Sequence, residues 1–296
     1  MTSRTAITAG LALALLATAA CSSSAEGDGE PGAGLAVVAS TDVWGDVVAQ
    51  VGGDLVEVTS IIDDPSADPH SFEASTRGQL ALSRAALVVA NGGGYDDFVD
   101  TMVGALAAAP PVVHAADVAD TGEENEHVWF SLDGVRAVAD EVAARLGELD
   151  PDNAATYTAN AEAFGRQVTG IQEQVAAIRD EHAGATVAMT EPLPVYLIQA
   201  AGLTDVTPGE FAEAIEEETD VPPTVMAELL RLVQGGEVDV LLYNEQTTGP
   251  QTEQVLAAAQ DAGVAVVPVT ETLPAGTGYI AWVTGTVEAL REALRS

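Results

Sequence analysis

The stretch Y157-T-A-N-A-E-A-F-G-R-Q-V-T-G-I-Q-E-Q-V-A-A-I178 decides the fold, because its apolar residues recur at alternating spacings of four and three. This spacing places them on one face of a helix. Asp150 and Pro151 suit a helix start. We therefore expect one long helix over 151–182, on the order of 45 Å in length. A coiled-coil dimer would give the same stripe, but the patterns on either side favour a helix that connects two lobes.

Short apolar segments alternate with helical patterns before and after this helix. The segments that read as strands are 35–40, 55–62, 86–90 and 111–114 on one side, and 185–190, 239–243 and 264–270 on the other. Such alternation is typical of parallel sheets covered by helices on both faces. The predicted fold class is therefore α/β, with mainly parallel sheets in an N-terminal lobe (35–150) and a C-terminal lobe (183–296), joined by the long rigid helix 151–182.

The first 34 residues predict export and attachment to a membrane. Residues 1–20 carry one charged side chain, Arg4, before an apolar run that is too short to span a bilayer as a mature helix. We expect a signal peptide over 1–20. Cys21, the only cysteine, follows in an arrangement that resembles a bacterial lipobox, although Thr18 stands where that pattern prefers leucine. The small, polar segment 21–34 then reads as a flexible tether.

These features predict a protein outside the cytoplasm, held to the outer face of the cell membrane by lipid on Cys21. An ordinary cleaved signal peptide with an incidental cysteine is the alternative.

The formal net charge of −36 argues against nucleic acid as a partner, because phosphate binding needs a basic face. The chain contains no lysine, which excludes Schiff-base chemistry, and its single cysteine excludes a thiolate metal cluster.

Polar residues follow the predicted strands at the edge where open α/β sheets bind ligands. They are Asp68-Pro69-His70, Glu191-Pro192, Asn244-Glu245-Gln246 and Glu271, and His127 adds an imidazole on a loop just before a helix. Two histidines and two carboxylates, drawn from both lobes, would make a cage for a divalent metal ion. Imidazole suits zinc, and carboxylate suits harder ions such as manganese.

Five segments resemble, in this order, the metal-binding solute receptors of zinc/manganese-type ABC importers. They are D68-P-H-S-F-E73, N125-E-H-V-W-F130, M189-T-E-P192, Y243-N-E-Q246 and V267-P-V-T-E-T272, and the resemblance covers essentially all of 35–296. Two departures stand out. Glu126 replaces the proline that usually precedes the second histidine, and Glu271 replaces an aspartate that is one methylene shorter.

The resemblance implies the two-lobed fold with a long rigid helix and a set of metal ligands: His70, His127, Glu191 and Glu271. Glu245 is the alternative fourth ligand. Otherwise Glu245 and Gln246 would orient a liganding histidine through its other nitrogen, while Asp68 shapes the approach of His70. Glutamate at position 191 is typical of manganese-type members.

The expected function is to bind a divalent transition metal ion, manganese or zinc, and to deliver it to an ABC permease in the membrane. The ion would be the transported ligand, so we expect no catalytic residue and no enzyme activity. We also expect a monomer. One alternative is a metal-dependent hydrolase that uses the same residues, with Glu245 as base. The other is a receptor for a non-metal solute, or an adhesin. The sequence leaves the choice between manganese and zinc open.

Overall fold

The computed structural model describes residues 34–64, 72, 75–122, 125–217 and 219–295. Cys21, Asp68 and His70 lie outside the described residues, as does the predicted signal peptide. Among the described residues, no helix combines the length and the apolar character needed to cross a membrane.

The first sheet contains four parallel strands in the order β2-β1-β3-β4. The strands are β1 (Leu35–Thr41), β2 (Val56–Ile62), β3 (Leu87–Ala90) and β4 (Val112–His114). Because side chains alternate along a strand, Val37 and Ala39 of β1 join one apolar cluster and Val38 joins another on the opposite face. The sheet is therefore buried on both sides.

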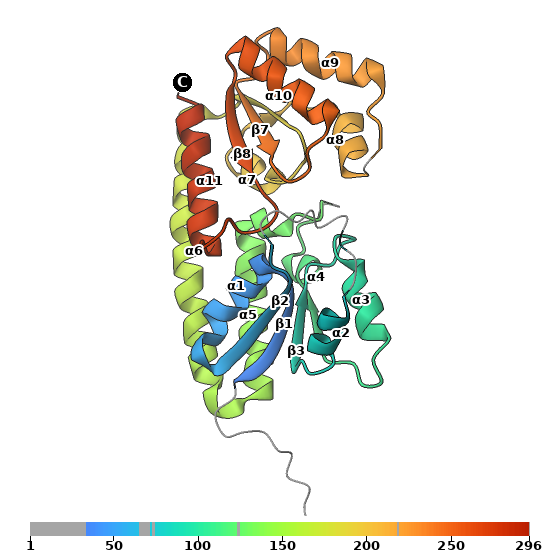
Figure 1. Ribbon diagram of the computed structural model, residues 1–296. Helices are drawn as coiled ribbons and strands as arrows, with labels where there is room; N and C mark the ends of the chain where they lie inside the picture. The colour runs from blue at the N-terminus through green and yellow to red at the C-terminus, as the bar shows by residue number, and fades with distance from the viewer. Residues whose placement is uncertain (1–33, 65–71, 73–74, 123–124, 218, 296) are drawn as a thin grey trace, which may run out of the picture. The chain divides into compact units, whose positions relative to one another are not determined.

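Helices of the N-terminal half cover both faces of this sheet (Figure 1). They are α1 (Asp42–Gly52), α2 (Thr76–Leu82), α3 (Asp97–Gly104), α4 (Ala115–Ala119) and α5 (Leu132–Leu149). Buried residues of α1 and α5 pack with Val37, and those of α2 and α3 pack with Val38.

The second sheet repeats this design with the order β6-β5-β7-β8, again all parallel. Its strands are β5 (Thr186–Met189), β6 (Thr204–Asp205), β7 (Val240–Asn244) and β8 (Ala265–Val269). The helices around it are α7 (Val195–Ala200), α8 (Gly209–Glu216), α9 (Pro223–Gln234), α10 (Pro250–Ala262) and α11 (Tyr279–Ala293). Ala188 and Leu241 face α8, α9 and α10, whereas Val187 and Leu242 join the cluster that contains α7 and α11.

The long helix is α6 (Ala154–His182), and a short 3₁₀ turn at Pro151–Asn153 precedes it. Its buried residues are the seven of the predicted stripe: Tyr157, Ala161, Phe164, Val168, Ile171, Val175 and Ile178. They belong to one continuous apolar cluster that includes residues of both sheets. The prediction of two α/β sheets joined by a long helix is thus confirmed, and the stripe is explained by contact with α1, α5 and α11 rather than with a second chain.

Candidate metal centre

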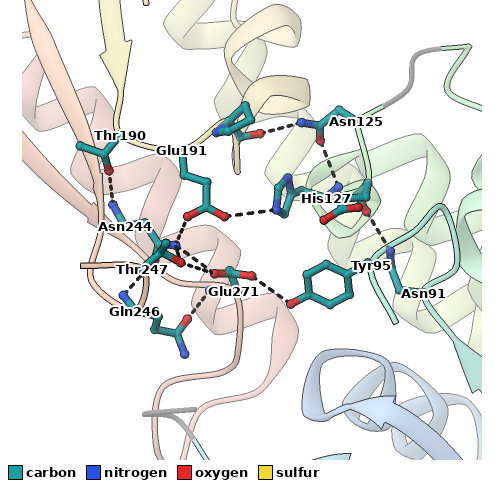
Figure 2. Close-up of polar contacts among 12 residues, drawn as sticks. Asn91, Tyr95, Asn125, His127, Thr190, Glu191, Asn244, Gln246, Thr247 and Glu271 are labelled. Carbon is teal, nitrogen blue, oxygen red and sulfur yellow. Dashed lines mark hydrogen bonds and ion pairs between the residues drawn. The ribbon is translucent and has the colours of Figure 1, made fainter. Parts of the chain in front are cut away.

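Three of the predicted ligands come together in the described structure. His127, Glu191 and Glu271 each offer a ligating atom, and these atoms lie within 4.8 Å of one another. All three residues are fully buried, at 0% exposure. The His127 Nε2 atom lies 3.8 Å from Glu191 Oε1, and the three side chains point toward one another (Figure 2).

Parallel pairing explains why the two carboxylates meet. Glu191 follows the end of β5, Glu271 follows the end of β8, and β7 lies between these two strands. Because parallel strands end at the same edge, their trailing residues converge there. Thr190 fixes this edge, since its backbone N–H donates to Leu242 and its Oγ1 accepts from the backbone N–H of Asn244 at 2.9 Å.

Asn244, the last residue of β7, bridges the two carboxylates. Its Nδ2 donates to Glu191 Oε2 at 2.6 Å and to Glu271 Oε1 at 2.9 Å. Thr247 Oγ1 also donates to Glu271 Oε1, at 3.1 Å (Figure 2). The bond to Glu191 Oε2 leaves Glu191 Oε1 turned toward His127. Asn244 belongs to the strand-end turn named from the sequence, but this bridging role was not predicted for it.

Tyr95 donates from its hydroxyl to the other oxygen of Glu271, Oε2, at 3.1 Å. Tyr95 follows β3, so this bond reaches from the first half of the chain to the second. Burial raises the pKa of Tyr95 well above its usual value, and the charge of Glu271 raises it further. Tyr95 therefore stays a neutral donor that holds Glu271 in place. No sequence motif pointed to it.

Gln246 supports Glu271 through the backbone. Its Oε1 accepts hydrogen bonds from the backbone N–H groups of Glu271 and Thr272, and its Nε2 donates to Thr272 Oγ1 at 2.6 Å. The expectation that Gln246 orients a histidine differs from this geometry, because the side chain is used to shape the turn that carries Glu271.

Glu245 is exposed, and its backbone N–H donates to Val269 O at 3.1 Å. Among the described residues it belongs to neither group of side chains spaced to hold a metal ion. Glu245 directly follows Asn244, the last residue of β7. Because successive side chains of an extended chain point to opposite sides, Glu245 points away from the side on which Asn244 faces Glu191 and Glu271.

The turn that carries His127 is held from both halves of the chain. Asn125 Oδ1 accepts from the backbone N–H of His127 at 3.0 Å, and Asn125 Nδ2 donates to Pro192 O at 3.0 Å. Tyr196 donates from its hydroxyl to Asn125 O at 2.6 Å. Pro192 adjoins Glu191, so these bonds fix the backbone of one candidate ligand against that of the other.

Comparison with known proteins assigns the chain to a family. The family model described as zinc-uptake complex component A, periplasmic, matches residues 37–293. The manganese-binding lipoprotein MntA of Halalkalibacterium halodurans is 27% identical over 234 residues, which cover 72% of this chain and 77% of that protein. The manganese ABC transporter substrate-binding lipoprotein scaA of Streptococcus gordonii is 28% identical over 179 residues. These residues cover 55% of this chain and 57% of that protein.

Solved structures share the fold. The periplasmic zinc-binding protein TroA from Treponema pallidum superposes with a TM-score of 0.75 at 19% identity, over 89% of this chain and 99% of that one. The laminin-binding protein Lmb of Streptococcus agalactiae also gives 0.75, at 22% identity, over 88% of this chain and 100% of that one. Because the family match extends over nearly all of the described chain, the chain belongs to the zinc-uptake complex component A family of periplasmic solute-binding proteins.

Proposed function

We propose that this protein binds one divalent transition metal ion, manganese or zinc, outside the cytoplasm and delivers it to an ABC permease. The observation that carries the proposal is the fully buried group of His127, Glu191 and Glu271, whose ligating atoms lie within 4.8 Å of one another. Relatives named for manganese binding and for ABC transport of manganese support the choice of ligand and partner.

Burial of two carboxylates is costly unless a cation or strong hydrogen bonds offset it. Asn244, Thr247 and Tyr95 supply neutral donors to Glu191 and Glu271. Neutral donors lower the cost without cancelling the charge, whereas a divalent cation would neutralise both carboxylates. The group is thus suited to capture a cation, and we include His70 as the fourth ligand on the strength of its sequence motif.

A receptor fits these residues better than a metal-dependent hydrolase does. A hydrolase would need a base beside an open metal position. Glu245, the residue considered for that role, is exposed and lies outside the described group. The hydrogen-bond donors around Glu271 instead hold its carboxylate in one position, which suits the binding of an ion.

The same proposal includes the location of the protein. We propose that residues 1–20 are removed, that lipid on Cys21 anchors the chain to the outer face of the cell membrane, and that 21–34 tether a monomeric two-lobed receptor near its permease. The naming of relatives as lipoproteins supports this arrangement. Mass spectrometry of Cys21 in protein from membranes tests it, because an unmodified thiol would exclude the lipid anchor.

Metal titration by calorimetry tests the proposed function directly. We expect wild-type protein to bind one Mn²⁺ or Zn²⁺ per chain. His127→Ala and Glu191→Gln should weaken binding at least about 100-fold, since the first removes an imidazole ligand and the second removes the charge of a carboxylate ligand. Glu237→Gln is the matched control, because Glu237 is an exposed carboxylate that pairs with Arg231 on the surface. Equal affinities in wild type and both ligand variants would overturn the proposal.

Two further measurements refine the ligand set and the choice of ion. His70→Ala should weaken binding as strongly as His127→Ala if His70 is the fourth ligand, and it should leave affinity unchanged if it is not. The metal content of protein isolated from its native host, together with competition between Mn²⁺ and Zn²⁺, identifies the physiological ion.

A further inference from the structure

A second group of side chains spaced to hold a metal ion adjoins the first. Glu126, His127 and Glu216 also offer ligating atoms within 4.8 Å of one another. His127 belongs to both groups. Glu126 and Glu216 are half-buried, whereas Glu191 and Glu271 are fully buried. The two carboxylate pairs thus share one imidazole and differ in their access to solvent.

We propose that Glu126, Glu216 and His127 form an outer divalent-cation site that receives the ion before it passes to Glu191 and Glu271. This inference rests on the proposed function, since it concerns the route to the same buried ligands. We call Glu126, His127 and Glu216 the outer site, and His127, Glu191 and Glu271 the inner site.

The backbone around Glu126 is fixed before any ion binds. Asn91 Nδ2 donates to Glu126 O at 2.9 Å, and the backbone N–H of Val128 donates to the same oxygen at 2.7 Å. The side chain of Glu126 lies over a glycine turn: a Cβ built on Gly94 would lie 3.4 Å from Glu126 Oε2. Gly94 has a φ of +103°, a backbone angle that residues other than glycine rarely adopt. A Cβ at that distance would make an ordinary van der Waals contact, so this turn requires glycine for its backbone conformation, and the Glu126 carboxylate lies against it.

Glu216 is the last residue of α8 and is placed by the packing of that helix. Phe211, Ala214 and Ile215 on the same helix are buried in the apolar cluster with α9 and α10. Thr219 completes the helix end, because its backbone N–H donates to Ala214 O at 2.8 Å. The carboxyl end of a helix carries partial negative charge, so a cation beside Glu216 is favoured by the helix as well as by the carboxylate.

Because the two sites share one imidazole, they cannot both hold an ion at the same moment. A neutral imidazole has one nitrogen that can accept and one that donates, so His127 ligates one ion at a time. An ion held by Glu126, Glu216 and His127 can exchange the two outer carboxylates for Glu191 and Glu271 while His127 stays bound. Hydration can be lost in stages along this route, because exposure decreases from the outer pair to the inner pair.

Glu126 is also a feature of this particular chain. It stands where the resemblance described above leads one to expect a proline, which has no ligating side chain. The substitution introduces a carboxylate directly beside the histidine, and α8 supplies the second carboxylate from the other half of the chain.

Stopped-flow kinetics with Mn²⁺ and with Zn²⁺ tests the inference, using the fluorescence of Trp129, whose ring lies 5.2 Å from that of His127. We expect the double variant Glu126→Gln/Glu216→Gln to associate about tenfold more slowly than wild type, because carboxylates that attract the ion at the entrance are lost. The number of ions bound should remain one per chain. The control is Glu213→Gln/Glu217→Gln, which makes the same charge change at exposed positions of the same region.

A second arm observes the outer site directly. In Glu191→Gln/Glu271→Gln we expect weak binding of one Mn²⁺, detected by electron paramagnetic resonance, and its loss when Glu126→Gln and Glu216→Gln are added. No Mn²⁺ binding by the inner-site variant, or equal association rates in the outer-site and control pairs, overturns the outer site. A wild-type protein without a one-to-one metal complex would instead overturn the proposed function, so the two failures are distinguishable.

Discussion

The carboxylate of Asp46, on α1, accepts a hydrogen bond from the backbone N–H of Tyr279, the first residue of α11, at 2.8 Å. The preceding residue, Gly278, has no side chain with which to cap the helix. A Cβ on Gly278 would lie 2.9 Å from Asp46 Oδ1, so glycine permits this close approach. Asp42, one turn earlier on α1, accepts from the backbone N–H of Leu273 at 3.1 Å. Both ends of the segment that follows Glu271 are therefore held by α1.

Replacement of Asp46 by alanine should destabilise the protein by about 1 kcal/mol, the usual cost of removing a helix N-cap. Gln50 also loses its hydrogen-bond acceptor, since its Nε2 donates to Asp46 Oδ2. Urea unfolding of the metal-free protein measures the free energy of unfolding. Asp54→Ala is the control, because Asp54 is exposed in a short 3₁₀ turn. A change no larger than that of the control would show that Asp46 does not cap α11.

Asp42 should make stability depend on pH. Burial raises the pKa of Asp42 from 3.8 to about 6, against the lowering effect of the hydrogen bond from Leu273. Since the folded-state pKa lies above the unfolded value, the folded protein binds this proton more tightly. The resulting stabilisation is complete below about pH 3.8 and is lost as the pH rises through about 6.

Asn is neutral at every pH, so Asp42→Asn removes this dependence. We expect the variant to be more stable than wild type by about 1 kcal/mol at pH 8, after discounting for solvent screening, and to match it near pH 4. Urea unfolding at both pH values, with a chelator present, measures the difference. A gap that is constant or that shrinks from pH 4 to pH 8 would contradict the expected ionisation of Asp42.

The long helix and most strands could be predicted because their signals are local. The stripe of α6 needs only the spacing of its own residues, and its prediction agrees with the described helix to within three residues at the start. α11 was not predicted, although Tyr279, Trp282, Val283 and Thr286 are buried along one face. Its sequence is rich in β-branched residues, which favour helices weakly, and packing against α6 outweighs that preference.

The candidate site could be predicted where strand ends supply titratable side chains, as with Glu191 and Glu271. It could not be predicted where the contribution depends on distant segments. Tyr95 reaches Glu271 across the chain, and Glu216 approaches His127 from α8. Asn244 was named in its strand-end turn but given no role, because its bridge joins Glu191 and Glu271, which lie far from it in the sequence.

Phe164 should be among the most costly residues of α6 to truncate. It is 1% exposed, and its ring centroid lies 5.8 Å from that of Tyr279 on α11. Phe164→Ala should lower the free energy of unfolding by about 3–5 kcal/mol, because apolar contact is lost and a cavity remains. Leu80→Ala, at a residue that is 51% exposed, should change it by no more than about 0.5 kcal/mol. Thermal and urea unfolding measure both variants, and similar losses would show that α6 is not central to the core.

Asn244→Ala should weaken metal binding without removing a ligand. Asn244 Nδ2 donates to Glu191 Oε2 at 2.6 Å and to Glu271 Oε1 at 2.9 Å. Loss of the amide therefore allows the two carboxylates to separate. Removal of a residue that orients metal ligands typically costs 10–100-fold in affinity, and we expect a loss of about that size for Mn²⁺ and Zn²⁺ in calorimetric titration.

The matched control is Asn160→Ala. Asn160 lies on α6, and its side-chain amide donates to Val51 O at 2.9 Å. This variant should bind metal with wild-type affinity, and circular dichroism should show that both variants are folded. If Asn244→Ala binds as tightly as Asn160→Ala, the two carboxylates are positioned by Tyr95, Gln246 and the backbone alone. If it binds more tightly, the amide competes with the ion for the carboxylate oxygens, and its role is to ease release of the metal rather than to secure it.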